Sequence, residues 1–140
     1  VVGHSNRTIA IDLASGSRVW EQPIGSMFGP WVAGDFIYVI SNEGEIACLL
    51  RKDGRIRWVR PLQRFEDEED KTDPIRWTGP VLAGDRLLVA GSNGEAVSLS
   101  PYSGKILGKV EMPDGVTISP IVAQDSLLFL SDDAELVAYR

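Results

Sequence analysis

The sequence predicts an all-β protein, a partial β-propeller with two complete and two partial four-stranded blades. The first observation is repetition: Gly44 and Gly54 are spaced like Gly94 and Gly104, with matching residues before and after them. The second is a series of short β-branched and aromatic runs, each bounded by turn residues. The third is the absence of helical periodicity. Repeats of about 40 residues, strand following strand, favour propeller blades over the alternative of two packed antiparallel sheets.

The clearest repeat covers residues 29–62. A short extended segment begins at Pro30, and a dense β-branched and aromatic run spans residues 36–40. Asn42-Glu43-Gly44 and Asp53-Gly54 are turn sequences, because Asn and Gly accept positive φ and Asp-Gly favours tight hairpins. The predicted strands are therefore residues 30–33, 36–40, 45–50 and 55–61.

The other copies are less complete. Residues 79–110 repeat the full pattern, whereas residues 118–140 end within the third strand. Residues 1–24 lack the front of a repeat and are expected to supply strands only at 8–13 and 17–22. We expect residues 1–140 to be the C-terminal sector of a single propeller domain within a longer protein.

Aligned copies predict how neighbouring blades pack. One column holds only small residues, Ala10, Cys48, Ser98 and Ala138, as expected where a strand lies close to another sheet. A second column holds large indoles, whose N–H groups need backbone acceptors when buried. In the third copy Gly108 replaces the indole, which predicts a weaker or differently filled contact there. The structural repeat positions are Trp20, Trp58, Gly16, Gly54 and Gly104.

Composition narrows the possible functions. A net charge of -6 argues against nucleic acid as a partner, because phosphate binding needs clustered Lys and Arg. The only cysteine, Cys48, cannot form an internal disulfide and is expected to be a small packing residue. The only histidine, His4, has no accompanying motif and is expected in an exposed loop. The sequence predicts no catalytic residue, no metal site and no cofactor.

An acidic insertion, residues 63–76, separates the second and third blades. Propeller topology places it at the same end as the turns before Glu45, Glu95 and Glu135. Three interpretations remain open: a solvated loop of repelling charges, a docking element for a basic partner surface, or a Ca²⁺ site. Phe65, Ile75 and Trp77 are expected to hold its base against the blade. The candidate partner-binding residues are Glu66, Asp67, Glu68, Glu69, Asp70, Arg76 and Trp77.

The motif Ala10-x-Asp12-x-x-Ser15-Gly16-x-x-x-Trp20 resembles the PQQ-type propeller repeat, in which Thr stands in place of this Ser. The match is partial at residues 48–58 and weaker at residues 98–108. The resemblance covers essentially the whole chain and implies a PQQ-type ring of eight blades. Because enzymes, scaffolds and sensors share this repeat, it says little about function.

Residues 73–87, 118–123 and 136–140 are similar to the C-terminal part of the BamB family, of the α-proteobacterial type. These are propeller lipoproteins of the bacterial outer-membrane β-barrel assembly machinery. The resemblance implies a periplasmic protein tethered to the outer membrane by an upstream lipid anchor, with BamA as partner and no catalysis or cofactor. None of the residues by which the family contacts BamA can be assigned to a position in this chain.

The sequence therefore predicts a non-enzymatic protein–protein interaction scaffold. The alternatives are a fragment of a PQQ-dependent dehydrogenase, which needs a quinone, Ca²⁺ and an Asp base, and a sensor or docking propeller attached to a bacterial kinase. A partial ring leaves apolar sheet faces uncovered, so the isolated chain is expected to self-associate, plausibly as a dimer.

Overall fold

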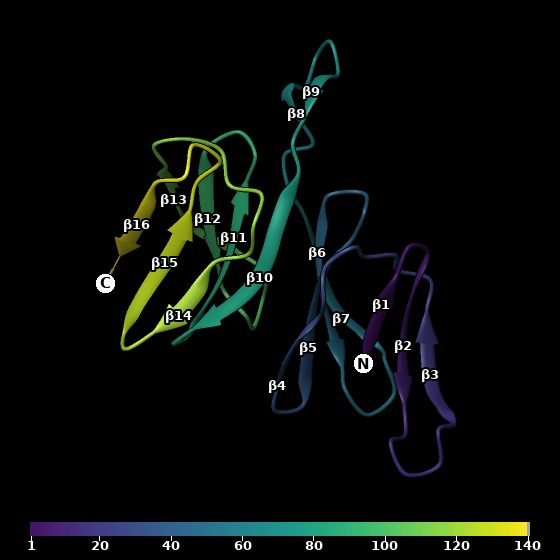
Figure 1. The fold of residues 1–140 in the computed structure, drawn as a ribbon. Helices are drawn as coiled ribbons and strands as arrows, with labels where there is room; N and C mark the ends of the chain where they lie inside the picture. Colours follow the sequence, from purple (N-terminus) through teal and green to yellow (C-terminus); the bar gives the residue numbers. More distant parts are fainter. Residues whose placement is uncertain (140) are drawn as a thin grey trace.

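The computed structural model describes residues 1–139 and contains sixteen strands in five antiparallel sheets (Figure 1). Four of the sheets are blades, and the fifth is a small hairpin between the second and third blades. Within each sheet the strands are paired in chain order, which is the meander expected of propeller blades. The predicted all-β partial propeller, with two complete and two partial blades, is confirmed.

The strand bounds follow the repeat. The first blade contains β1 (Val2–His4), β2 (Arg7–Ile11) and β3 (Arg18–Gln22), and the second contains β4 (Trp31–Ala33), β5 (Phe36–Ile40), β6 (Glu45–Leu50) and β7 (Ile56–Pro61). The hairpin consists of β8 (Phe65–Asp67) and β9 (Thr72–Pro74). The third blade contains β10 (Trp77–Ala83), β11 (Arg86–Gly91), β12 (Glu95–Leu99) and β13 (Ile106–Glu111), and the fourth contains β14 (Ile121–Ala123), β15 (Ser126–Leu130) and β16 (Leu136–Tyr139).

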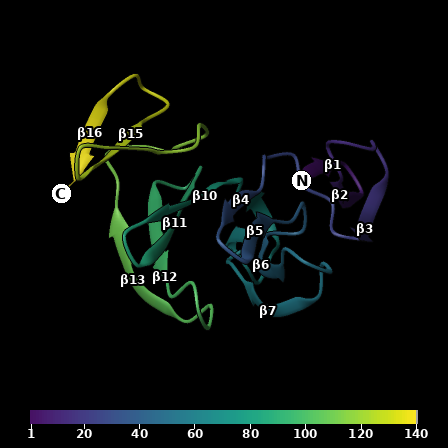
Figure 2. The same cartoon turned by 90° about the horizontal axis from the view of Figure 1, so that it is seen from below.

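The blades follow one another along an arc (Figure 2). Strand β10, the first strand of the third blade, contacts β4 and β5 of the second blade and β14 of the fourth. The first strands of these blades therefore lie on the inner side of the arc, where the central channel of a propeller would be. The last strands, β3, β7 and β13, lie farther out.

Three expectations about the strands were wrong. The strand expected over residues 8–13 is Arg7–Ile11, so it ends two residues earlier. Residues Val2–His4 form a strand that pairs with β2, so the first blade has three strands where the sequence predicted two. In the third blade the first strand begins at Trp77, ahead of the Gly79 start expected from the repeat, and a register shift between Thr78 and Val81 accommodates the added residues.

The hydrophobic core is divided among the three contacts between blades. Five buried residues fill the first contact: Ala10, Trp20, Ile37, Val39 and Leu49. The contact between the second and third blades is the largest and includes Tyr38, Ile46, Trp77, Leu87 and Val97. The third contact is formed by Ala90, Ala96, Met112, Val116 and Phe129. Each blade therefore depends on its neighbours to shield its flat faces from water.

Each tryptophan of the repeat packs on a turn glycine of the following blade. The Trp20 indole lies against Gly54, where an added Cβ would be only 2.6 Å from the ring, and its Nε1 donates to the Arg51 carbonyl at 2.8 Å. Trp58 meets Gly104 in the same way, with the added Cβ at 2.5 Å. We call this arrangement the Trp–Gly contact. Its hydrogen bond satisfies the buried indole N–H, as the sequence required.

The small-residue column lies opposite the indole within the same blade. Ala10 pairs with Trp20 across β2 and β3, and Cys48 pairs with Trp58 across β6 and β7. A register shift directly follows both pairs, at Ala10/Ile11 and Cys48/Leu49. The small side chain leaves room beside the ring, and the irregularity adds local twist to the outer strand.

The contact between the third and fourth blades is filled differently, as Gly108 predicts. A cavity of about 270 Å³ is lined there by Ser98, Gly108, Met112, Phe129 and Tyr139, among others. Phe129 and Tyr139 contact each other edge to face, with ring centroids 5.8 Å apart. Aromatic side chains of the fourth blade therefore occupy part of this contact, where no indole is present.

Candidate interaction surface

Most of the acidic residues gather at one end of the blades, which we call the loop face. The turns β5–β6, β11–β12 and β15–β16 lie at this end, and the hairpin β8–β9 extends from it (Figure 1). Since alternate turns of an antiparallel meander share an end, the carboxylates at the third-strand starts come together there. They are Glu43, Glu45, Glu95, Asp132, Asp133 and Glu135.

The acidic insertion forms an ordered hairpin. Phe65 pairs with Pro74, and Asp67 pairs with Thr72. One carboxylate oxygen of Asp67 accepts bonds from the Glu69 and Asp70 backbone N–H groups, each at 3.0 Å, so this side chain caps the turn.

Glu68 also folds back onto the hairpin. Its Oε1 accepts a bond from the Arg64 backbone N–H at 2.8 Å. Two of the five consecutive carboxylates, those of Asp67 and Glu68, therefore stabilise the hairpin itself. Glu66, Glu69 and Asp70 are exposed and remain available to a partner.

The base of the hairpin is anchored by Trp77. Its side chain is only 4% exposed, and its Nε1 donates to the Gln63 carbonyl at 2.7 Å. Ile75 is buried beside it, and its backbone N–H donates to the Arg64 carbonyl at 2.8 Å. Trp77 therefore cannot serve as an exposed partner contact, and its side chain is a packing residue.

Arg76 behaves differently from its two neighbours. Its side chain is exposed, whereas its backbone is held at both groups: the N–H donates to Ser92 Oγ at 3.0 Å, and the carbonyl accepts from the Ser92 backbone N–H at 3.0 Å. It lines a cavity of about 400 Å³ at the foot of the hairpin, together with Met27, Phe28 and Trp77. Met27 is 85% exposed. The sequence did not predict this apolar patch, because Met27 and Phe28 lie in a connection outside the repeat pattern.

The one cysteine and the one histidine lie in different surroundings. Cys48 is 1% exposed, and burial raises the pKa of its thiol to about 11, so it is protonated at neutral pH. His4 is exposed, with its Nδ1 3.2 Å from the Ser5 hydroxyl. Within residues 1–139 no three His, Cys, Asp or Glu side chains converge as metal ligands. The same residues include no helix long and apolar enough to cross a membrane.

The repeat motif has a clear local basis. The Asp12 carboxylate accepts bonds from the Ala14 and Ser15 backbone N–H groups, at 3.1 and 2.8 Å, and from the Ser15 hydroxyl at 2.9 Å. The bonds from Ser15 lower the pKa of Asp12 below its usual range. Gly16 then turns the chain at φ +70° toward the strand that carries Trp20. Four-stranded blades, this capped turn and the Trp–Gly contact together define a β-propeller of PQQ-type repeats.

The sequence matches the family described as outer membrane protein assembly factor BamB over residues 1–60 and 63–140, and the chain belongs to this family. Outer membrane protein assembly factor BamB of Marinobacter adhaerens is 24% identical over 145 residues, an alignment that covers 100% of this chain and 34% of that protein. The chain therefore spans about a third of the length of this curated relative.

Solved structures agree on the fold. The crystal structure of BamB from Moraxella catarrhalis gives a TM-score of 0.72 at 19% identity, covering 97% of this chain and 44% of that one. A europium-containing methanol dehydrogenase gives 0.59 at 23% identity, covering 89% of this chain and 22% of that one. At these identities the likeness shows a shared propeller fold and leaves the function open.

Proposed function

We propose that this chain is a sector of a non-enzymatic scaffold that binds other proteins during outer-membrane β-barrel assembly. The observation that carries the proposal is the family match over residues 1–60 and 63–140, together with the description of that family as an assembly factor. By the same reasoning we place the complete protein in the periplasm, tethered to the outer membrane by an upstream lipid anchor.

The chemistry of the site supports a binding role. The thiol of Cys48 is buried and protonated, and His4 is paired only with a neighbouring hydroxyl. The loop face instead offers an ordered acidic hairpin beside an apolar cavity that Arg76 lines. Apolar area flanked by charge is typical of protein-binding surfaces, where charge steers the encounter.

We assign partner contact to the solvent-facing residues Glu66, Glu69, Asp70 and Arg76. Asp67 and Glu68 would act indirectly, because they hold the hairpin in shape. BamA of the assembly complex is the partner that the family resemblance implies, and a basic surface on that partner would complement the hairpin.

The test uses the full-length protein and purified periplasmic domains of BamA. A variant carrying Glu66→Gln, Glu69→Gln and Asp70→Asn removes three charges without touching the capping residues. A matched control carrying Asp35→Asn, Asp85→Asn and Asp125→Asn removes three charges from turns at the opposite end of the blades. We expect the hairpin variant to slow association several-fold at low salt, and the control variant to leave it unchanged.

Two results would contradict the proposal. If the unmodified protein fails to bind any purified component of the assembly machinery, the scaffold role is wrong. If binding survives but both variants behave alike, the scaffold stands and the hairpin is not its contact. Dye-reducing activity that develops after addition of pyrroloquinoline quinone and Ca²⁺ would support the dehydrogenase alternative instead.

A further inference from the structure

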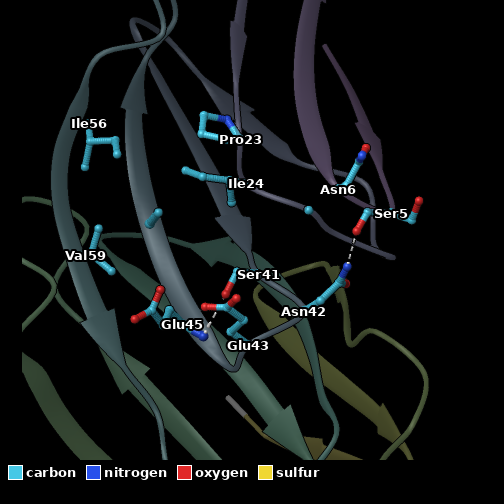
Figure 3. Close-up of a pocket in the computed structure, with 12 residues that line it drawn as sticks. Ser5, Asn6, Pro23, Ile24, Ser41, Asn42, Glu43, Glu45, Ile56 and Val59 are labelled. Carbon is cyan, nitrogen blue, oxygen red and sulfur yellow. Dashed lines mark hydrogen bonds between the residues drawn. The ribbon is translucent and has the colours of Figure 1, made fainter.

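A further cavity lies between the first two blades, and we call it the Glu45 groove. Its volume is about 350 Å³, within the size range of small-ligand sites. Figure 3 shows Glu43 and Glu45 at one end of the groove, with Ile24, Ile56 and Val59 along its walls. The groove therefore combines an apolar lining with two carboxylates.

The next blade shows what the equivalent carboxylate binds. Glu95 occupies the position of Glu45 one repeat later, at the start of the third strand. The Lys109 ammonium lies 3.0 Å from Glu95 Oε1. That oxygen is buried, and apart from this ion pair no donor among residues 1–139 bonds to it, so the lysine is its neutralising partner. In the third blade the carboxylate at this position is thus compensated by a lysine of the neighbouring outer strand, β13.

The second blade lacks this lysine. The strand registers make the correspondence clear, since Lys109 pairs with Val97 whereas Val59 pairs with Ala47. Val59 therefore stands where the third blade has its cation. Among residues 1–139 neither Glu43 nor Glu45 forms an ion pair.

The groove is held open by bonds between the two blades. The Asn42 side-chain amide donates to the Ser5 carbonyl at 2.6 Å, and the Asn42 backbone N–H donates to the Gly25 carbonyl at 2.9 Å. Within the second blade, the Glu45 backbone N–H donates to Ser41 Oγ at 3.1 Å. A rim fixed in this way favours binding, because less conformational freedom is lost when a ligand enters.

We propose that the Glu45 groove binds a lysine side chain of a protein partner. The ammonium pairs with Glu45 and Glu43, as Lys109 pairs with Glu95, and the aliphatic stem lies along Ile24 and Val59. The assignment goes beyond the proposed scaffold function and does not depend on it, because both walls of the groove belong to blades present in this chain.

The probe is Nα-acetyl-lysine N-methylamide, titrated into the full-length protein and followed by methyl NMR of the groove residues. The comparison ligand is the norleucine analogue, which has a similar stem and no ammonium. We expect the lysine amide to shift the Ile24, Ile56 and Val59 methyl signals, with an affinity that falls as salt is added. The norleucine analogue should bind at least tenfold more weakly.

Two variants follow from the repeat. Glu45→Gln should weaken the lysine amide at least tenfold, since it removes the charge and keeps the shape. Val59→Lys should abolish binding, because the new lysine pairs internally with Glu45 as Lys109 does with Glu95. Unchanged circular dichroism would show that both variants remain folded.

The reciprocal variant is Lys109→Val, which gives the third blade the composition of the second. It should create a second lysine-amide site that shifts signals around Glu95 and leaves the first site intact. Equal binding of lysine and norleucine amides, or unchanged binding in both Glu45→Gln and Val59→Lys, would overturn the proposal. Methyl shifts confined to other parts of the protein would also overturn it.

Discussion

The Trp–Gly contact can be tested by adding a single methyl group. Gly54 has φ +74°, and a Cβ built on it would lie 2.6 Å from Cδ2 and Cε3 of the Trp20 ring. Gly16 has nearly the same conformation, φ +70°, with no atom within 4 Å of an added Cβ. The two glycines therefore share a backbone requirement and differ in whether an indole lies against them.

Comparing the two glycines separates the cost of the left-handed backbone from the cost of overpacking against the indole. Placing alanine in the left-handed region destabilises by about 1 kcal/mol, and this applies to Gly16→Ala and Gly54→Ala alike. At Gly54 the methyl also overpacks the contact, which adds about 1–3 kcal/mol. Displacement of Trp20 would further weaken its bond to the Arg51 carbonyl, by about 1 kcal/mol. We therefore expect a loss of about 3–5 kcal/mol for Gly54→Ala and about 1 kcal/mol for Gly16→Ala.

The measurement is urea unfolding of the 140-residue chain, followed by tryptophan fluorescence and repeated by circular dichroism. The midpoint should fall much farther for Gly54→Ala than for Gly16→Ala, with Gly104→Ala resembling Gly54→Ala because Trp58 lies 2.5 Å from its added Cβ. Equal losses at Gly16 and Gly54 would refute the reasoning, since the indole would then contribute nothing to the requirement for glycine.

Other parts of the structure give further predictions. Gly108→Ala should raise the unfolding free energy by about 0.5–1 kcal/mol, because its Cβ would meet only the Ser98 hydroxyl at 3.5 Å and fill part of a cavity; a lower melting temperature would contradict this. The raised pKa of the Cys48 thiol predicts stability that is full below pH 9, where the unfolded thiol is still protonated, and is lost as pH rises toward 11; Cys48→Ala should flatten that part of the pH profile. Trp77→Phe should lower the unfolding free energy by about 1–3 kcal/mol, because it leaves the Gln63 carbonyl unpaired and removes packing. Amide hydrogen exchange should become faster in the hairpin β8–β9 than in the blades. The isolated chain should scatter light as a dimer or larger species, because both end faces expose apolar side chains; a clean monomer at high concentration would count against it.

The repeat pattern in the sequence predicts most of the fold. Columns at Gly54, Gly104, Trp20 and Trp58 predicted turn positions and buried indoles with backbone acceptors. They did not predict that each indole packs on a turn glycine of the following blade, because the small-residue column, expected against a neighbouring sheet, faces the indole within its own blade. The sequence predicts the turn positions and the buried indoles because every blade buries a flat sheet face against its neighbour, so the same residue types recur at the same positions of each copy. The substitution at Gly108 was informative for the same reason.

Features outside the repeat were harder to predict. Val2–His4 is too short to show alternation, and only its pairing with β2 makes it a strand. The hairpin at residues 65–74 carries five consecutive charges that conceal any period-two pattern. Met27 contributes to the loop-face cavity through the path of a connection, which no column describes.

The Glu45 groove could be predicted from the sequence only in part. The columns that align Glu45 with Glu95 and Val59 with Lys109 are present in the sequence, so the missing cation could have been noticed. Its meaning needed the structure, because only the 3.0 Å separation of Lys109 and Glu95 shows that the two columns meet on one face of the blade.

The uneven filling of the three blade contacts has a consequence for how the chain comes apart. Indole rings fill the first and second contacts between blades, whereas the third contact contains a cavity beside Gly108. In a linear array each unit is stabilised by its nearest neighbours, so fraying begins where the adjoining contact is poorest. Residues 118–139 should therefore detach first, while the three preceding blades remain associated.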